Sequence, residues 1–163
     1  MVLYTPEERA RRDASPWTVV QAVLAPLQFL VFVVSLALLV RYLVSGAGFE
    51  AATVSVIVKT LVLFTIMITG SIWEREVFGR YLFARPFFWE DVVSLWVVAL
   101  HMAYVGSLLT GMLAGRHQIY LALVAYASYV VNASQFVVKL RAARLERNPT
   151  VVPLHSVVSG ATP

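Results

Sequence analysis

The residues of this chain best suited to chemistry lie inside long apolar stretches. Lys59 and His101 each interrupt one such stretch, and Asn132 and Gln135 interrupt another. Polar groups at membrane depth are costly and usually face the interior of a helix bundle, where they bind ligands or transfer protons. For each amide the alternative is an interhelical hydrogen bond, worth about 0.5 to 2 kcal/mol. For Lys59 we favour a structural role, by snorkelling or by pairing with a carboxylate.

Glu90 and His101 share one face of the third apolar stretch. Eleven residues separate them, which at about 100° per residue returns to within roughly 20° of the same direction. They lie about 16 Å apart along the helix axis at 1.5 Å per residue, so they could address two ends of one large ligand. His101 is either a hydrogen-bonded core residue or, as a neutral imidazole, an axial ligand for a tetrapyrrole metal.

Three carboxylates, Glu74, Glu90 and Asp91, lie near one boundary of the apolar stretches. If they are solvated, nearby arginines pair with them. If one is buried, the loss of solvent favours its protonated form, which can then donate a proton. We predict that the proton donor is one of these three, with Glu90 ranked first because it shares its face with His101.

Two stripes of polar residues indicate a shared interior. The first stripe recurs every seven positions and the second follows three- and four-residue steps, so each occupies one helix face. The stripes are Gln21, Gln28, Ser35 and Tyr42, and Ser128, Asn132, Gln135 and Lys139. Fewer groups would suffice to hold helices together, so we predict a polar cavity that binds a ligand. The candidate substrate-binding residues are His101, Asn132, Gln135, Gln28 and Tyr104.

Composition fixes the class of protein that must position these residues. The chain has 163 residues, of which 60% are hydrophobic and 13% charged, and its mean hydropathy is +0.77, so a water-soluble domain is excluded. We predict an all-α, polytopic four-helix bundle, since each span needs roughly 20 residues. The expected membrane domain is 1–147, with spans at about 17–44, 51–73, 88–113 and 118–140, followed by an irregular tail at 148–163.

The distribution of Lys and Arg predicts the orientation. One side of the four-span arrangement carries only Arg41 and Arg116, and the other carries Arg9, Arg11, Arg12, Arg75, Arg80, Arg85, Lys139, Arg141, Arg144 and Arg147. By the positive-inside rule both termini are cytoplasmic. A basic collar near anionic headgroups also accounts for the pI of about 9.7, so we expect no nucleic-acid partner.

Other features limit the function classes and the connections. Cysteine is absent, and the chain lacks a phosphate-binding glycine loop, a zinc-type His-Glu-x-x-His and a serine nucleophile elbow. Between spans two and three, charges mixed with aromatics favour a surface-lying helix or hairpin. Ser107, Gly111 and Gly115 form a ladder of small residues on the third span, typical of a packing face within the bundle or between protomers.

Three long segments resemble the 2-vinyl bacteriochlorophyllide hydratase family, also called chlorophyllide 3-vinyl hydratase. They read YTPEERARRDASPWTVVQAVLAPLQFLVFVVSLALLVRYL, IMITGSIWEREVFGRYLFARPFFWEDVVSLWVVALHMAY and AYASYVVNASQFVVKLRAARLE. The resemblance implies a hydro-lyase that adds water to the 3-vinyl group of a magnesium chlorin and gives a 3-(1-hydroxyethyl) group. It implies no added cofactor, although His101 could ligate the magnesium of the substrate. No catalytic residue is carried over from the family.

The resemblance also sets the expected surroundings. The protein would be a multi-pass protein of the cytoplasmic or intracytoplasmic membrane of a phototrophic bacterium, in contact with lipid. Its partners would be a chlorophyllide-type substrate and water, and a second copy of the chain or other pigment-biosynthesis enzymes. Two alternatives stay open: a non-catalytic tetrapyrrole scaffold or carrier ligated by His101, and a small proton-coupled transporter using Glu74, Glu90 and Lys59.

Overall fold

The protein is an all-helical bundle. A computed structural model describes residues 3–147, and within them there are helices and no strands, which confirms the predicted all-α class. The helices are α1 (Pro6–Ala14), α2 (Pro16–Ser45), α3 (Phe49–Phe78), α4 (Phe88–Thr110) and α5 (Gly115–Arg147). The predicted irregular tail at 148–163 lies outside the described residues.

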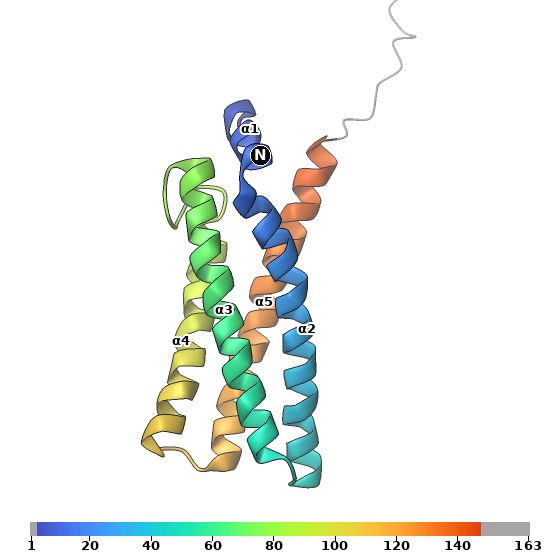
Figure 1. Ribbon diagram of the computed structural model, residues 1–163, viewed down its shortest axis with the longest axis vertical. Coiled ribbons are helices and arrows are strands. Elements are labelled where there is room, and N and C mark those ends of the chain that lie inside the picture. The colour runs from blue at the N-terminus through green and yellow to red at the C-terminus, as the bar shows by residue number, and fades with distance from the viewer. Residues whose placement is uncertain (1–2, 148–163) are drawn as a thin grey trace, which may run out of the picture.

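The four long helices run along the long axis of the molecule and form two antiparallel hairpins (Figure 1). α2 packs mainly on α3 and α4 mainly on α5, whereas the two hairpins meet through fewer residues. The short α2–α3 and α4–α5 turns lie at one end of the bundle. α1, the α3–α4 connection and the last turns of α5 lie at the other end.

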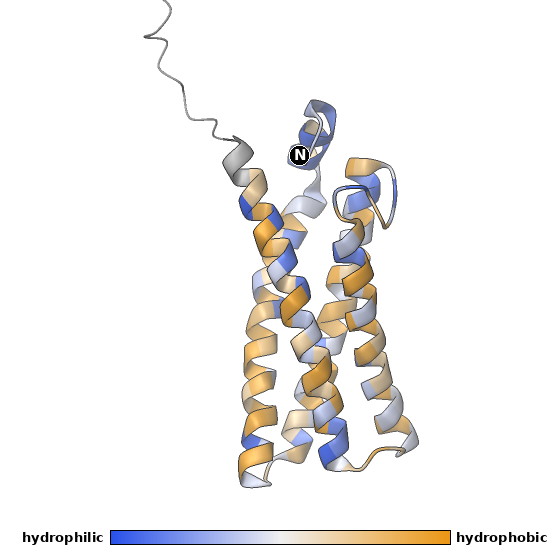
Figure 2. Cartoon of the chain, turned by 180° about the vertical axis from the view of Figure 1, so that it is seen from behind, coloured by the Kyte–Doolittle hydropathy of each residue, from blue (hydrophilic) through white to orange (hydrophobic). Residues whose placement is uncertain are grey.

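The outer surface of the bundle is suited to lipid. All four long helices are long and apolar enough to cross a membrane, α5 over residues Gly115–Ala143. Large apolar side chains such as Val23, Leu61 and Val137 are exposed, while Lys59 and Asn132 are buried. Figure 2 shows this distribution, with hydrophobic colouring along the helices and hydrophilic colouring concentrated in α1 and the α3–α4 connection. This arrangement supports a membrane protein with a polar interior.

Glycines in the left-handed conformation set two helix ends that the hydropathy pattern leaves open. Gly79 has φ 79° and ends α3, and Gly111 has φ 66° and ends α4. The predicted ladder of small residues on one helix is therefore wrong: Gly111 terminates α4, and Gly115 begins α5. The predicted surface helix or hairpin between the second and third spans is also wrong, because α3 continues to Phe78 and residues 79–87 form an irregular turn.

α1 is a helix that the hydropathy pattern does not reveal. Thr5 and Glu8 form a capping box, in which each side chain accepts a hydrogen bond from the other residue's backbone N–H. The helix docks on the end of α3: Arg11 donates to the Val77 carbonyl at 2.8 Å, and Ser15 donates to Glu76 at 2.6 Å. The sequence signal was present in TPEE, where Thr and Glu are three residues apart.

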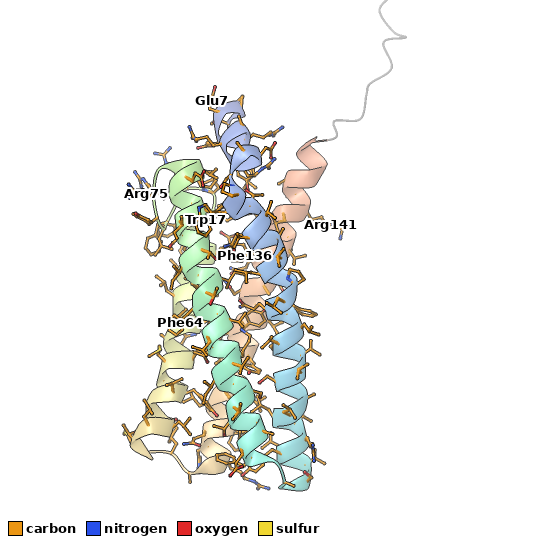
Figure 3. All side chains as sticks on the ribbon, in the orientation of Figure 1. Glu7, Trp17, Phe64, Arg75, Phe136 and Arg141 are labelled. Carbon is orange, nitrogen blue, oxygen red and sulfur yellow. The ribbon has the colours of Figure 1, made fainter. Side chains whose placement is uncertain are left out.

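The predicted basic collar has a counterpart in the structure. Figure 3 places Glu7, Arg75 and Arg141 at the end of the bundle that carries α1, although they come from three different helices. Trp17 lies near the same end, as expected for an aromatic residue at a membrane interface. Both described chain ends therefore lie on one side of the bundle. That this side is cytoplasmic stays a prediction.

Candidate active site

Two groups of buried polar residues occupy the interior of the bundle at different depths. The carboxyl cluster lies near the end that carries α1 and consists of Glu74, Glu90, Asp91, Ser94, Asn132 and Lys139. The central cluster lies deeper and consists of Ser35, Lys59, His101, Tyr126 and Tyr129. Asp91 and His101 are both on α4, ten residues or about 15 Å apart along its axis.

Glu74 and Asp91 form a carboxyl–carboxyl pair between α3 and α4. Their exposed fractions are only 5% and 4%, and their side chains are close enough to interact. Two like charges at one buried site repel each other, so such a pair is suited to carrying one negative charge and one proton. Two backbone N–H groups support the pair: Phe83 donates to Asp91 at 2.6 Å, and Ala84 donates to Glu74 at 3.3 Å. The pair can therefore hold a transferable proton.

The turn that supplies these N–H groups has an unusual backbone. Phe83 has φ 61°, in the left-handed region, although it is not glycine. A non-glycine residue there costs of order 1 to 3 kcal/mol and persists only where the surroundings fix it. Here the left-handed residue places two successive N–H groups against the two carboxyl groups. The irregular 79–87 segment is thus shaped to hold the carboxyl pair.

Glu90 differs from its two neighbours because it has a cationic partner. Its carboxylate lies 2.5 Å from the Lys139 ammonium group, and Lys139 also donates to the Pro86 carbonyl. Glu90 is 6% exposed, so the alternative in which solvent and arginines surround it is wrong. Protonation of Glu90 would leave the Lys139 ammonium group without its counter-ion. The contacts therefore make Glu90 a poorer proton donor than the Glu74–Asp91 pair.

Asn132 joins α5 to α4 through its amide. Its amide nitrogen donates to the Glu90 carbonyl and to the Ser94 hydroxyl, each at 3.0 Å. Both hydrogen bonds that this amide nitrogen can donate are therefore made to α4. This is the interhelical hydrogen bond that the sequence offered as the alternative to ligand binding.

His101 is fully buried and held in a defined orientation. Its Nδ1 lies 2.8 Å from the Val97 carbonyl, and because a carbonyl only accepts, Nδ1 carries the proton. Its Nε2 is buried without a hydrogen-bond partner. In the neutral ring Nε2 keeps a free lone pair, so the ring can accept a hydrogen bond or ligate a metal. The ring stacks on Tyr126 with centroids 5.9 Å apart.

Lys59 occupies the centre of the bundle without a counter-ion. It is 0% exposed, its Nζ has no hydrogen-bond partner, and no carboxylate of residues 3–147 pairs with it. Its ammonium group lies 3.9 Å from the centre of the Tyr129 ring. The predicted snorkelling or carboxylate pairing of Lys59 is therefore wrong, because helix packing places it far from both the interface and the acidic residues.

The remaining predicted binding residues line the interior but do not form one site. Gln28 is buried on α2 and interacts with Tyr129. Gln135 is half-buried, and its Oε1 has no partner. Tyr104 is fully buried and interacts with Thr53. Among the described residues no group of three or more His, Asp or Glu side chains could hold a metal ion.

Some members of the two clusters were not candidates in the sequence analysis. Lys139 was placed on a polar stripe, but its pairing with Glu90 depends on helix packing. Tyr126 was a candidate only as a proton source of last resort, after the carboxylates. Tyr129 was not a candidate, although it precedes Asn132 by three residues and helical spacing could have placed the two on the same face. The backbone donors of Phe83 and Ala84 had no sequence signal.

Comparison with known proteins identifies the family. The family described as 2-vinyl bacteriochlorophyllide hydratase matches residues 4–142, which include both clusters. A 2-vinyl bacteriochlorophyllide hydratase of Rhodobacter capsulatus is 64% identical over 144 residues, covering 88% of this chain and 84% of the relative. One of Cereibacter sphaeroides is 60% identical over 144 residues, covering 88% and 89%. No solved structure matches the chain. The chain belongs to the 2-vinyl bacteriochlorophyllide hydratase family.

Proposed function

We propose that this protein is a membrane hydratase of bacteriochlorophyll biosynthesis, which adds water to the vinyl group of a magnesium chlorin of the chlorophyllide type. Family membership over residues 4–142 carries the reaction, as do two hydratases at 64% and 60% identity. The bundle suits such a substrate, since a flat apolar ring can partition from lipid into a membrane interior. The scaffold and transporter alternatives gain no support.

The reaction needs one proton donor and one acceptor. The donor gives a proton to the terminal vinyl carbon, which leaves positive charge on the carbon next to the macrocycle, where conjugation spreads it. Water then attacks that carbon and loses a proton, so the vinyl group becomes a 1-hydroxyethyl group with the gain of one water. Buried carboxyl groups are suited to both proton transfers.

We assign the proton donor to the Glu74–Asp91 pair. Two adjacent buried carboxyl groups can share one proton, so that one member donates it and the other accepts the proton released by water. Glu90 is ranked after this pair because its carboxylate is paired with Lys139. The support for this assignment is the burial of both carboxyl groups and the backbone N–H groups that bond to them.

We assign to His101 the role of axial ligand to the magnesium of the substrate. Its Nδ1–H is fixed by the Val97 carbonyl, and its free Nε2 is the atom that binds metals in such an arrangement. The pigment then extends along the bundle axis from His101 toward the carboxyl pair. We place the protein in the cytoplasmic or intracytoplasmic membrane with both termini in the cytoplasm.

A single assay separates hydration from pigment carriage. Purified protein in detergent is incubated with vinyl chlorophyllide, and both the absorption spectrum and the pigment mass are followed. A hydratase raises the mass by one water. A carrier shifts the spectrum while the mass stays unchanged, and that result would contradict the proposed function.

A further inference from the structure

Lys59 is the least satisfied charged residue described in the bundle. Burying an isolated ammonium group costs several kcal/mol unless it is paired. The contact with the Tyr129 ring at 3.9 Å returns only part of this cost. A packed hydrophobic side chain would fill the same place at lower cost. The retention of a bare cation therefore points to a partner that the chain itself does not supply.

His101 lies at the same depth in the bundle and also has a polar atom without a partner. Lys59 lies ten residues from the start of α3 and His101 nine residues from the end of α4, so each is about 15 Å from the same end of the bundle. The two side chains are close enough to interact electrostatically. Lys59 needs an acceptor, preferably an anion, and the Nε2 of His101 is free to bind a metal or a donor.

An open groove lies on the lipid-facing surface between α2 and α5, where the helices contact each other sparsely. It has a volume of ≈ 360 Å³. Its lining is Phe29, Tyr129, Val130, Ala133, Ser134, Val137 and Val138. Tyr129 belongs to both regions, because its ring lines the groove and contacts the Lys59 ammonium group. A ligand that displaces this ring gains access to Lys59.

We infer that Lys59 binds the free carboxylate of the pigment and thereby selects chlorophyllides over their esters. The identity of the pigment rests on the proposed function. A magnesium chlorin with a free propionate side chain carries both missing partners, a metal for His101 and an anion for Lys59. The carboxylate replaces the Tyr129 ring as the contact of the ammonium group. An ester of the same pigment lacks the charge and leaves Lys59 unpaired.

The test compares the binding of two ligands that differ only in this group. Vinyl chlorophyllide and its methyl ester are titrated into the purified protein, and binding is followed by absorption. Removing one partner of a buried charge pair typically costs 2 to 5 kcal/mol, so the free acid should bind the native protein at least about 30-fold more tightly. In Lys59→Met the two ligands should bind with similar affinity. The control Arg41→Met removes an exposed cation outside both clusters, and it should keep the preference.

A second measurement tests whether the role of Lys59 is purely structural. Replacing an unpaired buried charge by an apolar side chain of similar length should leave the thermal stability of the pigment-free protein unchanged or raised. A clear loss of stability in Lys59→Met would show that Lys59 has a structural partner and would overturn the inference. So would an undiminished preference for the free acid in Lys59→Met, or equal binding of both ligands to the native protein. Binding is read from the absorption change on mixing, before product accumulates, and the pigment mass is checked separately. Failure of the hydration assay is therefore distinguishable from failure of this inference.

Discussion

At the scale of single residues, two adjacent carboxyl groups that share a proton can provide a donor and an acceptor at one place. Glu74 and Asp91 have this arrangement, and the backbone N–H groups of Phe83 and Ala84 hold it in position. Replacing either carboxyl group by its amide removes the exchangeable proton or the negative charge that accepts one. Even a substitution that preserves the shape of the side chain should therefore impair the pair.

Glu74→Gln and Asp91→Asn should each lower the hydration rate by about 10² to 10⁴, the usual contribution of general acid–base catalysis. Pigment binding should persist, since no binding contact is removed. Glu90→Gln is the matched control, in which the rate should fall much less. The measurement is the initial rate of product formation with folded protein. If Glu90→Gln were the only inactive variant, the original ranking from the sequence would be right and the carboxyl pair would have another role.

His101→Phe should weaken the binding of the magnesium pigment by roughly tenfold or more, because the metal ligand itself is lost. Binding of the same pigment without magnesium should not change. Spectroscopic titration with both pigments measures the two affinities. The exposed His117 provides a control, and His117→Phe should change neither affinity. An equal loss for both pigments in His101→Phe would show that the ring packs against the macrocycle and does not ligate its metal.

The candidate residues could be named from the sequence, but their relations could not. The sequence left open whether Glu74, Glu90 and Asp91 are solvated or buried, and the structure shows that all three are buried. Which carboxylate meets a cation depends on how α5 is placed against α4, and that is set by long-range packing. The sequence ranked Glu90 above Glu74 and Asp91 because it does not reveal the ion pair between Glu90 and Lys139.

At the scale of elements, α4 carries more of the described buried polar residues than any other helix. Its buried face bears Glu90, Asp91, Ser94 and His101, and Asn132 attaches that face to α5 through two hydrogen bonds. The position of α4 against α5 therefore fixes where the carboxyl groups of α4 lie along the axis of the bundle. Asn132 acts here as a structural residue.

Asn132→Leu should lower the free energy of unfolding by about 0.5 to 2 kcal/mol, the range for interhelical hydrogen bonds in membrane bundles. The position of the pigment absorption band should not change. Thermal or denaturant unfolding in detergent gives the first quantity and pigment titration the second. Should stability be unaffected while pigment affinity falls, Asn132 would bind the substrate, as the sequence first suggested.

Helix ends were less predictable than helix interiors. Hydropathy fixes where an apolar helix must cross the membrane, so the four long helices follow from composition and length. It does not fix where a helix stops in water or at the interface. The extension of α3 to Phe78 and the end of α4 at Gly111 depend on backbone conformation, and α1 depends on a capping box in a polar segment.

At the scale of the whole molecule, the bundle has one end rich in charge and one end with two short turns (Figures 2 and 3). Both described chain ends lie at the charged end. This agrees with an even number of spans. By the positive-inside rule, the excess of Lys and Arg at this end predicts that it faces the cytoplasm.

Reporter fusions placed in the turns 46–48 and 111–114 should therefore read as extracytoplasmic, and fusions at both termini as cytoplasmic. Each fusion is compared with a reporter of the opposite preference at the same position. A cytoplasmic signal from either turn would overturn the orientation, and opposite signals from the two turns would overturn the four-span arrangement.

The central claim is that this chain protonates a vinyl group and adds water to it. The most direct measurement is turnover of vinyl chlorophyllide in heavy water, followed by transfer of the product to ordinary water and mass analysis. The proposed reaction predicts a product that has gained one water and keeps one deuterium, on the new methyl carbon, after the hydroxyl deuterium has exchanged. Hydration without retained deuterium would contradict the proposed protonation step, and pigment of unchanged mass would contradict the assignment as a hydratase.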